Sequence, residues 1–256
     1  FVDYAKTWGT NKVVIDSNGL NFRGNPDTVT IEYNTSGETA NIVYSGATKG
    51  WVPLIQDGAP VSYTGIFAFG STGSNVNTIN LLNGAGVVAS DSTGTGTGRN
   101  SIAAASYGGD KGIFGFGYVS GNVSMTNLCT SQGVMASDVT GTGTARRTPG
   151  AASYGSTGQC IFAFGLAGGS VNTINLVNSS GVMAGDTSGT GTARNGVMAA
   201  AGIMYGVDKA IFAFGDSGSY TNLSNLVSSS GVVATDTTGV GTARTGLGGS
   251  NLKGSI

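Results

Sequence analysis

The chain of 256 residues contains no histidine. This absence excludes Ser-His-Asp and Cys-His catalysis, and it removes the commonest general base and the usual zinc ligand. Charge is scarce as well, because 10% of the residues are Asp, Glu, Lys or Arg and the formal net charge is −1. Binding to nucleic acid or to anionic lipid needs a basic field, so we expect no nucleic-acid partner.

Long apolar runs are also missing, so we expect no insertion into a membrane. The sequence is instead rich in glycine, with 46 residues. Little charge with much Gly, Ser, Thr and Asn is typical of short strands joined by tight turns, but also of disordered chains, so periodicity must decide between them. The chain opens at Phe1 with no Met and no signal-peptide pattern, and we expect it to be a piece of a longer or processed chain.

A fourfold internal repeat dominates the sequence. The motif Ile-Phe-Ala/Gly-Phe-Gly recurs with spacings of 47, 48 and 50 residues, beginning at Ile66, Ile113, Ile161 and Ile211. An Asn-Leu pair, a Gly-Val turn and a single Asp keep the same step, and the Asp residues are Asp91, Asp138, Asp186 and Asp236. A Gly/Thr loop follows and ends at Arg99, Arg146, Arg194 and Arg244. A fixed period of this length indicates a repeat architecture.

Each repeat is predicted to hold four short β-strands. In the second repeat we expect them at Ala103–Tyr107, Gly112–Phe116, Ser124–Thr130 and Gly133–Asp138. Alternation along a strand would place Phe114 and Phe116 on one face, where they suit the interface between neighbouring repeats. The small residues of the first strand suit a crowded innermost position.

Four-stranded units at this period are the pattern of a β-propeller, in which stacked blades bury faces that one blade cannot bury alone. We therefore predict an all-β chain with a small β module over residues 1–58 and about four blades over residues 59–256. The units are expected at about 59–98, 99–145, 146–193 and 194–243, followed by a trailing strand. A closed ring, an open stack and a ring completed by further sequence are all compatible with this pattern.

The second repeat carries Arg99, then Ala-Ala-Ser-Tyr, then Lys-Gly-Ile-Phe-Gly-Phe-Gly, and this order resembles a kelch repeat. The usual Gly-Gly doublet is a single Gly here, and the blade-end Trp is absent. Thr-Asn-Leu, Gly-Val-Val-Ala-x-Asp and Gly-Thr-Gly-Thr-Ala-Arg are similar to segments of kelch-like arrays in structural proteins of tailed bacteriophages. The resemblance covers about 185 residues. It implies a virion component such as a tail fibre, an appendage or a decoration protein.

The first 58 residues do not share the repeat. Strands are expected at residues 12–16, 28–34 and 40–45. Asn18-Gly19 and Ser36-Gly37 are turn signals, and residues 53–60 are expected to form a linker. The segment resembles a small β module of phage tail-fibre and other virion proteins, which implies a role in attachment or assembly.

The polar residues that recur in every repeat are predicted to be structural. Each repeat Asp is expected to accept hydrogen bonds from the Gly/Thr loop or to pair with an Arg, and a weak calcium site is the alternative. The repeat Arg residues are expected to be buried forks, with a ring around a ligand as the alternative. The loop Gly94–Gly98 lacks the phosphate-binding pattern and is interpreted as a turn between blades. Arg147 occurs in one repeat only and is expected to face solvent.

Two cysteines, Cys129 and Cys160, are too few for a disulfide framework. Both stand where other repeats have small or apolar residues, so we predict buried apolar roles for them, with a disulfide or a metal pair as the alternative. A glycosidase needs two close carboxylates, which one Asp per repeat does not supply. We therefore predict no catalytic residue, no metal site, no cofactor and no enzymatic activity.

Tyr118 and Tyr220 are the candidate partner-binding residues, because they lie in the variable loop after the second strand, where other repeats have Ser71 or Gly169. Exposed rings at this place could stack on sugars, and ordinary surface placement is the alternative.

The expected function is that of a non-enzymatic structural protein in the virion of a tailed phage. It would offer a rigid platform to other virion proteins or to host surface glycans, in multiple copies within a symmetric particle. A lectin-like propeller on a phage or bacterial surface is the alternative. A polysaccharide-degrading enzyme is a third and weaker hypothesis.

Overall fold

The computed structural model of the chain describes residues 1–24, 31–37, 39–53, 63–196, 203–205 and 208–246. The described residues form β-strands, turns and loops and no helix, so the predicted all-β class is confirmed. The chain divides into two compact units, Phe1–Ser62 and Tyr63–Ile256. The predicted boundary at residue 58 falls within residues 54–62, outside the described residues.

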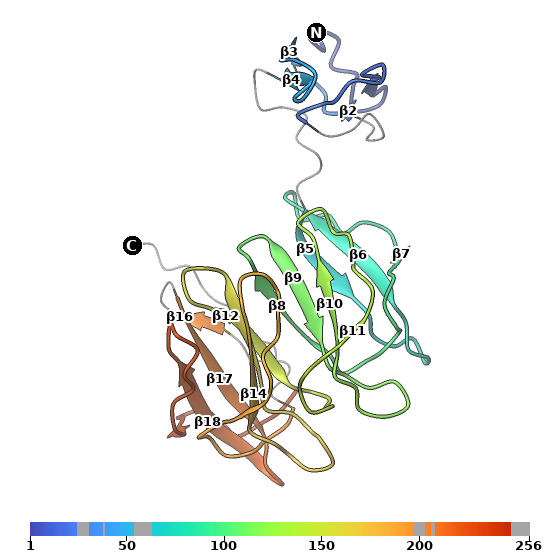
Figure 1. Cartoon of the computed structure of the whole chain (residues 1–256). Coiled ribbons are helices and arrows are strands. Elements are labelled where there is room, and N and C mark those ends of the chain that lie inside the picture. The colour runs from blue at the N-terminus through green and yellow to red at the C-terminus, as the bar shows by residue number, and fades with distance from the viewer. Residues whose placement is uncertain (25–30, 38, 54–62, 197–202, 206–207, 247–256) are drawn as a thin grey trace. The chain divides into compact units, whose positions relative to one another are not determined.

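The first unit contains two small antiparallel sheets (Figure 1). Strand β1 pairs with β2 and β3 pairs with β4, with bounds Val13–Ile15, Ile31–Tyr33, Ile42–Tyr44 and Trp51–Pro53. Strands β1 to β3 lie within the predicted ranges. Strand β4 was not predicted, because Pro53 suggested the start of the linker. The carboxylate of Asp3 accepts the backbone N–H groups of Thr7, Trp8 and Gly37 and so ties the amino-terminal turn to a later one.

The second unit is a series of antiparallel sheets, and the residues it describes, 63–196, 203–205 and 208–246, are named the repeat array. The first sheet has three described strands, β5 Tyr63–Ala68, β6 Thr78–Asn83 and β7 Ser92–Thr93. The second has β8 Ala103–Tyr107, β9 Lys111–Gly115, β10 Met125–Cys129 and β11 Val139–Thr140. The third has β12 Gly150–Tyr154, β13 Gln159–Ala163, β14 Thr173–Val177 and β15 Thr187–Ser188. The fourth has β16 Ile203–Tyr205, β17 Lys209–Asp216, β18 Tyr220–Val227 and β19 Thr237–Thr238.

Consecutive strands pair with one another, so each of these sheets is a simple meander. The predicted first strand of the first repeat and the predicted trailing strand lie mostly outside the described residues. The prediction of a fourth strand at Gly133–Asp138 is wrong, because that segment makes one isolated bridge and the paired strand is Val139–Thr140. Gly133 turns the chain at φ 81°, and Asp138 directs its carboxylate to the loop from the preceding sheet, so a continuous ladder with β10 forms only after Asp138.

The prediction that both Phe residues of the repeat motif share one face is also wrong. Phe116 has a left-handed backbone with φ 62°, which interrupts the alternation of the strand. As a result, Phe114 packs edge-on against Phe69 of the preceding sheet, with ring centroids 5.7 Å apart. Phe116 instead packs against Phe162 of the following sheet, at 5.5 Å. The same pairing recurs between Phe164 and Phe212 at the next junction, at 5.6 Å.

The apolar core therefore lies between successive sheets. The four sheets lie side by side in sequence order (Figure 1), and each of three buried clusters draws residues from two adjacent sheets. Cys129 and Cys160 are buried in these clusters and form no disulfide, which confirms their predicted apolar role. Burial raises the pKa of Cys160 to about 12, so this thiol stays protonated.

Removing a ring from a junction should destabilise the array far more than removing the equivalent ring at its end. Phe162→Ala should lower the free energy of unfolding by about 3–5 kcal/mol, because the ring is fully buried and its loss leaves a cavity. Phe67 is the matching residue of the first sheet and is 58% exposed, so Phe67→Ala should cost less than about 1 kcal/mol. Urea denaturation in dilute solution measures both, and equal losses would contradict a core between the sheets.

Candidate functional site

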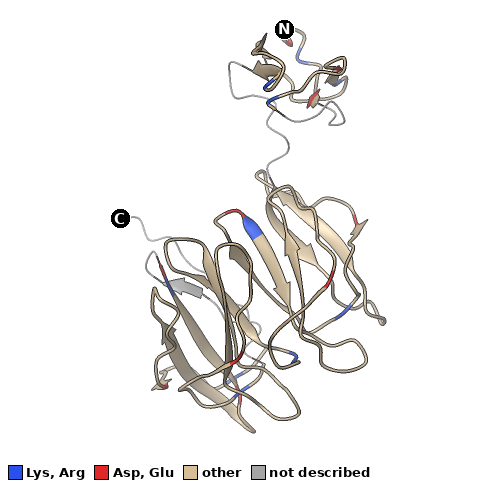
Figure 2. Ribbon diagram, viewed as in Figure 1, with Lys and Arg blue, Asp and Glu red and all other residues tan. Residues whose placement is uncertain are grey.

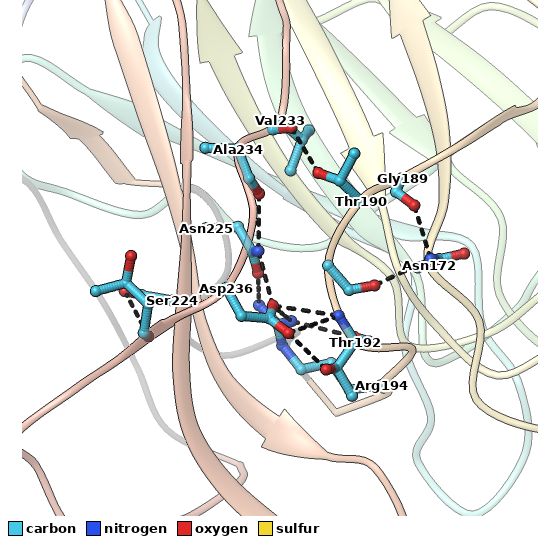
Figure 3. A network of polar contacts seen from close by, with 12 residues as sticks. Asn172, Gly189, Thr190, Thr192, Arg194, Ser224, Asn225, Val233, Ala234 and Asp236 are labelled. Carbon is cyan, nitrogen blue, oxygen red and sulfur yellow. Dashed lines mark hydrogen bonds and ion pairs between the residues drawn. The ribbon is translucent and has the colours of Figure 1, made fainter.

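A buried arginine occupies each junction between successive sheets. Figure 3 shows the third junction, where Arg194 is 0% exposed in the loop that leads from the third sheet to the fourth. Its Nε donates to the carbonyl of Phe214 at 2.9 Å and its Nη2 donates to Oδ1 of Asn225. Its Nη1 donates to the carbonyl of Thr192, and the guanidinium lies 4.0 Å from the ring centroid of Phe164. One side chain thus binds backbone and side-chain groups of two sheets.

The acceptor side of this junction is held by a second set of hydrogen bonds. Asn225 donates its amide to Oδ1 of Asp236 at 2.9 Å and to the carbonyl of Ala234 at 3.0 Å. Asp236 in turn accepts the backbone N–H of Thr192 at 2.9 Å and the hydroxyl of the same residue. The nearest oxygen of Asp236 lies 3.7 Å from Nη1 of Arg194. We name the set of Arg, Asn, Asp and Thr at a junction the clamp.

The same clamp is present at the other two junctions. At the first it consists of Arg99, Asn127, Asp138 and Thr97, and at the second of Arg146, Asn175, Asp186 and Thr144. The Nε atom donates to a Phe carbonyl at 2.9 Å in both, and the guanidinium lies 4.1 Å and 3.7 Å from a Phe ring of the preceding sheet. The predicted roles of these Asp and Arg residues are confirmed at these junctions.

Local backbone geometry positions the clamp. The Phe that offers its carbonyl to the arginine is left-handed, and the Gly that follows it donates its N–H to the next arginine carbonyl, as Gly165 does to Arg194 at 3.0 Å. The Gly/Thr loop passes so close to the Asn that a Cβ at Gly191 would lie 2.6 Å from Nδ2 of Asn225. Glycine is therefore required in this loop by contact with the next sheet, which confirms the turn between units.

Burial and hydrogen bonding set the charge states of the clamp. Burial lowers the pKa of Arg99, Arg146 and Arg194 to about 10 against the attraction of the nearby Asp, so all three stay charged at neutral pH. Burial raises the pKa of Asp138, but hydrogen bonds from Thr97 and Asn127 and the charge of Arg99 outweigh it and hold the value below 3.8. Asp186 and Asp236 shift in the same direction for the same reasons.

The two ends of the repeat array depart from the prediction. Arg244 is exposed, where a buried fork was predicted, because no described sheet follows it. It keeps its place 4.1 Å over the ring of Phe214, and its Nη1 donates to Thr242. Asp91 was predicted to bind a Gly/Thr loop or an Arg, but it accepts only Asn80 within the described part of the chain.

The structure does not bring the candidate residues Tyr118 and Tyr220 together. Tyr118 follows β9 of the second sheet and is partly buried, with the guanidinium of Arg147 5.1 Å from its ring centroid. Arg147 was predicted to face solvent, and it is half-buried beside this ring instead. Tyr220 begins β18 of the fourth sheet and is 61% exposed.

The described residues contain no cluster of three or more Cys, Asp or Glu side chains that could hold a metal ion. Figure 2 shows Lys and Arg scattered among Asp and Glu along the described part of the ribbon. None of the described segments forms a helix long and apolar enough to cross a membrane. The donors and acceptors of each clamp are hydrogen-bonded to one another, so the clamp joins adjacent sheets.

Sequence reasoning missed the role of the repeated Asn. A constant spacing in the sequence could have indicated this role. Asn127 lies eleven residues before Asp138, and the same spacing recurs in the next two clamps. The left-handed Phe was missed too, because a bulky residue seldom adopts a positive φ.

No protein-family model and no curated protein matches this chain.

Replacing a clamp arginine with lysine should destabilise the array although the charge is kept. Lysine lacks the planar fork, so Arg146→Lys would leave Asn175 and the carbonyl of Phe164 without their donors. We expect a loss of about 2–4 kcal/mol of unfolding free energy by urea denaturation. The matched change Arg244→Lys, at the exposed end, should cost less than about 0.5 kcal/mol. Similar losses in the two variants would show that the clamp is not structural.

Acid should weaken the junctions. The folded-state pKa values of Asp138, Asp186 and Asp236 lie below the ordinary 3.8, so their stabilisation is complete above that pH and is lost as the pH falls through the folded values. Unfolding free energy should therefore drop steeply below about pH 4. Asp186→Asn should lower stability at neutral pH and flatten this acid dependence, and an unchanged slope would contradict the assignment.

Proposed function

We propose that this chain is a non-enzymatic structural and binding protein of a tailed-phage virion, as a fibre, appendage or decoration component. The observation that carries the proposal is that the repeated polar residues are engaged with one another. Three Arg, three Asn and three Asp side chains join sheets instead of lining a cleft. The similarity of the repeat segments to kelch-like arrays of phage proteins supports the virion setting.

We further propose that the sheets are blades of a kelch-like β-propeller. Four-stranded meanders that bury apolar residues against the next sheet support this reading. Such a stack is a rigid scaffold, and its turns project the same side chain from each unit. The Gly-Val turn presents a row of exposed valines that suits contact with other virion proteins, at Val87, Val134, Val182 and Val232.

A carbohydrate-binding propeller is the second candidate, and the exposed ring of Tyr220 favours it. Tyr118 supports it less, because Arg147 covers one side of that ring. If sugars bind here, Tyr220→Ala should abolish glycan-array signal and Tyr118→Ala should reduce it less. An array on which the unaltered chain binds no saccharide would remove this candidate.

The virion proposal is tested by mass spectrometry of purified phage particles together with cryo-electron microscopy. We expect the chain in the particles at a fixed copy number, with density for stacked sheets at symmetric positions. Its absence from particles purified to constant infectivity would overturn the proposal. Cleavage of a host polysaccharide by the purified chain would overturn the non-enzymatic part.

A further inference from the structure

Each junction in the repeat array is built from two unlike halves. The preceding sheet contributes a donor half, made of the Gly/Thr loop with its Thr and Arg, the left-handed Phe and a Leu. The following sheet contributes an acceptor half, made of the other Phe, the Asn, the Asp and the Gly-Val turn. Donors come from the preceding sheet and acceptors from the following sheet at every described junction. The first sheet therefore carries an acceptor half that no described residue fills. The fourth sheet carries a donor half that no described residue meets.

The unfilled acceptor half is exposed on the first sheet. Phe67 is 58% exposed, whereas its equivalents Phe114, Phe162 and Phe212 are between 0% and 4% exposed. Val88 is 50% exposed, whereas its equivalent Met135 is 5% exposed. Asn80 already holds Asp91 at 2.7 Å, as Asn225 holds Asp236 in a complete clamp. We name Phe67, Asn80, Gly86, Val88 and Asp91 the leading face.

The donor half on the fourth sheet already has the geometry seen at the internal junctions. The guanidinium of Arg244 lies 4.1 Å over the ring of Phe214 and donates to the carbonyl of Thr242 at 2.9 Å, as the buried arginines do. Among the described residues its Nε and Nη2 have no acceptor, whereas Nε and Nη2 of Arg194 bind Phe214 and Asn225. We name Phe214, Leu226, Val240, Thr242 and Arg244 the trailing face.

Apolar contacts match in the same way. At internal junctions a Leu packs over the glycine of the next turn, so that a Cβ at Gly133 would lie 2.5 Å from a methyl group of Leu81. The equivalent position at Gly86 has nothing within 4 Å, and the equivalent Leu226 is 42% exposed. The leading face thus has an empty space over Gly86. The trailing face carries Leu226, and its equivalents fill that space at the internal junctions.

We propose that the trailing face of one copy of this chain binds the leading face of a second copy and so repeats the internal junction between chains. Arg244 then donates to Asn80 and to the carbonyl of Phe69, and Thr242 donates to Asp91. Both faces belong to one chain and lie on the first and last of four sheets stacked in order (Figure 1), so the contact is heterologous and produces either a closed ring or a filament. This inference does not depend on the virion proposal.

One residue makes this junction different from the internal ones. Val240 stands where Thr95 donates its hydroxyl to the carbonyl of Met135, so the junction between chains has one hydrogen bond fewer. The association is therefore expected to be weaker than an internal junction and to depend on protein concentration.

Charge reversal on one face at a time tests the proposal by sedimentation velocity over a concentration series. The unaltered chain should associate as concentration rises. Asp91→Lys alters only the leading face and Arg244→Glu alters only the trailing face. Both residues are exposed, so both variants should fold. Each should weaken self-association about tenfold or more. Asp110→Lys alters an exposed turn residue outside both faces and should associate like the unaltered chain.

Mixing the two variants distinguishes this contact from any other. An equimolar mixture keeps one intact trailing face, on the Asp91→Lys chain, and one intact leading face, on the Arg244→Glu chain, so it should form 1:1 complexes visible by native mass spectrometry. A monomeric unaltered chain at all concentrations would overturn the proposal. So would single variants that associate normally, or a mixture that associates no more than its components.

Discussion

A desolvated guanidinium that bridges two sheets is the interaction on which the repeat array depends. An arginine buried without acceptors would be costly, so its N–H groups must find partners on both sides of the junction. This requirement accounts for the repeated Asn, for the Phe carbonyl turned toward Nε, and for the Asp that holds the Asn and the loop in place. The left-handed Phe satisfies two needs at once, because it turns its carbonyl to one arginine while its ring lies beneath the next.

The clamp also makes the array directional. Donors come from the preceding sheet and acceptors from the following one, so no sheet can complete both of its faces alone. The apolar residues follow the same order, since each junction pairs the second Phe of one repeat with the first Phe of the next. Among the described residues, the first sheet therefore keeps acceptors, and the fourth keeps donors, that no neighbouring sheet fills.

Much of this was predictable from the sequence, because repetition exposes which residues matter together. The period, the all-β class, the strand Ala103–Tyr107 and the burial of both cysteines followed from pattern and composition. The fourth strand and the direction of Phe116 did not, because both depend on contacts with a neighbouring sheet that alternation within one strand does not report. The distinct state of Asp91 and Arg244 was missed for a related reason. Symmetry in sequence implied equal environments, but no described sheet precedes the first or follows the fourth.

Hydrogen exchange of the arginine Nε–H groups, followed by nuclear magnetic resonance, tests the clamp most directly. The chain has six arginines, Arg23, Arg99, Arg146, Arg147, Arg194 and Arg244. Buried, hydrogen-bonded Nε–H groups exchange slowly because solvent reaches them only when the structure opens. The account predicts slow exchange for Arg99, Arg146 and Arg194 and fast exchange for Arg244 in the monomeric chain. Rapid exchange at all six would contradict the buried clamp.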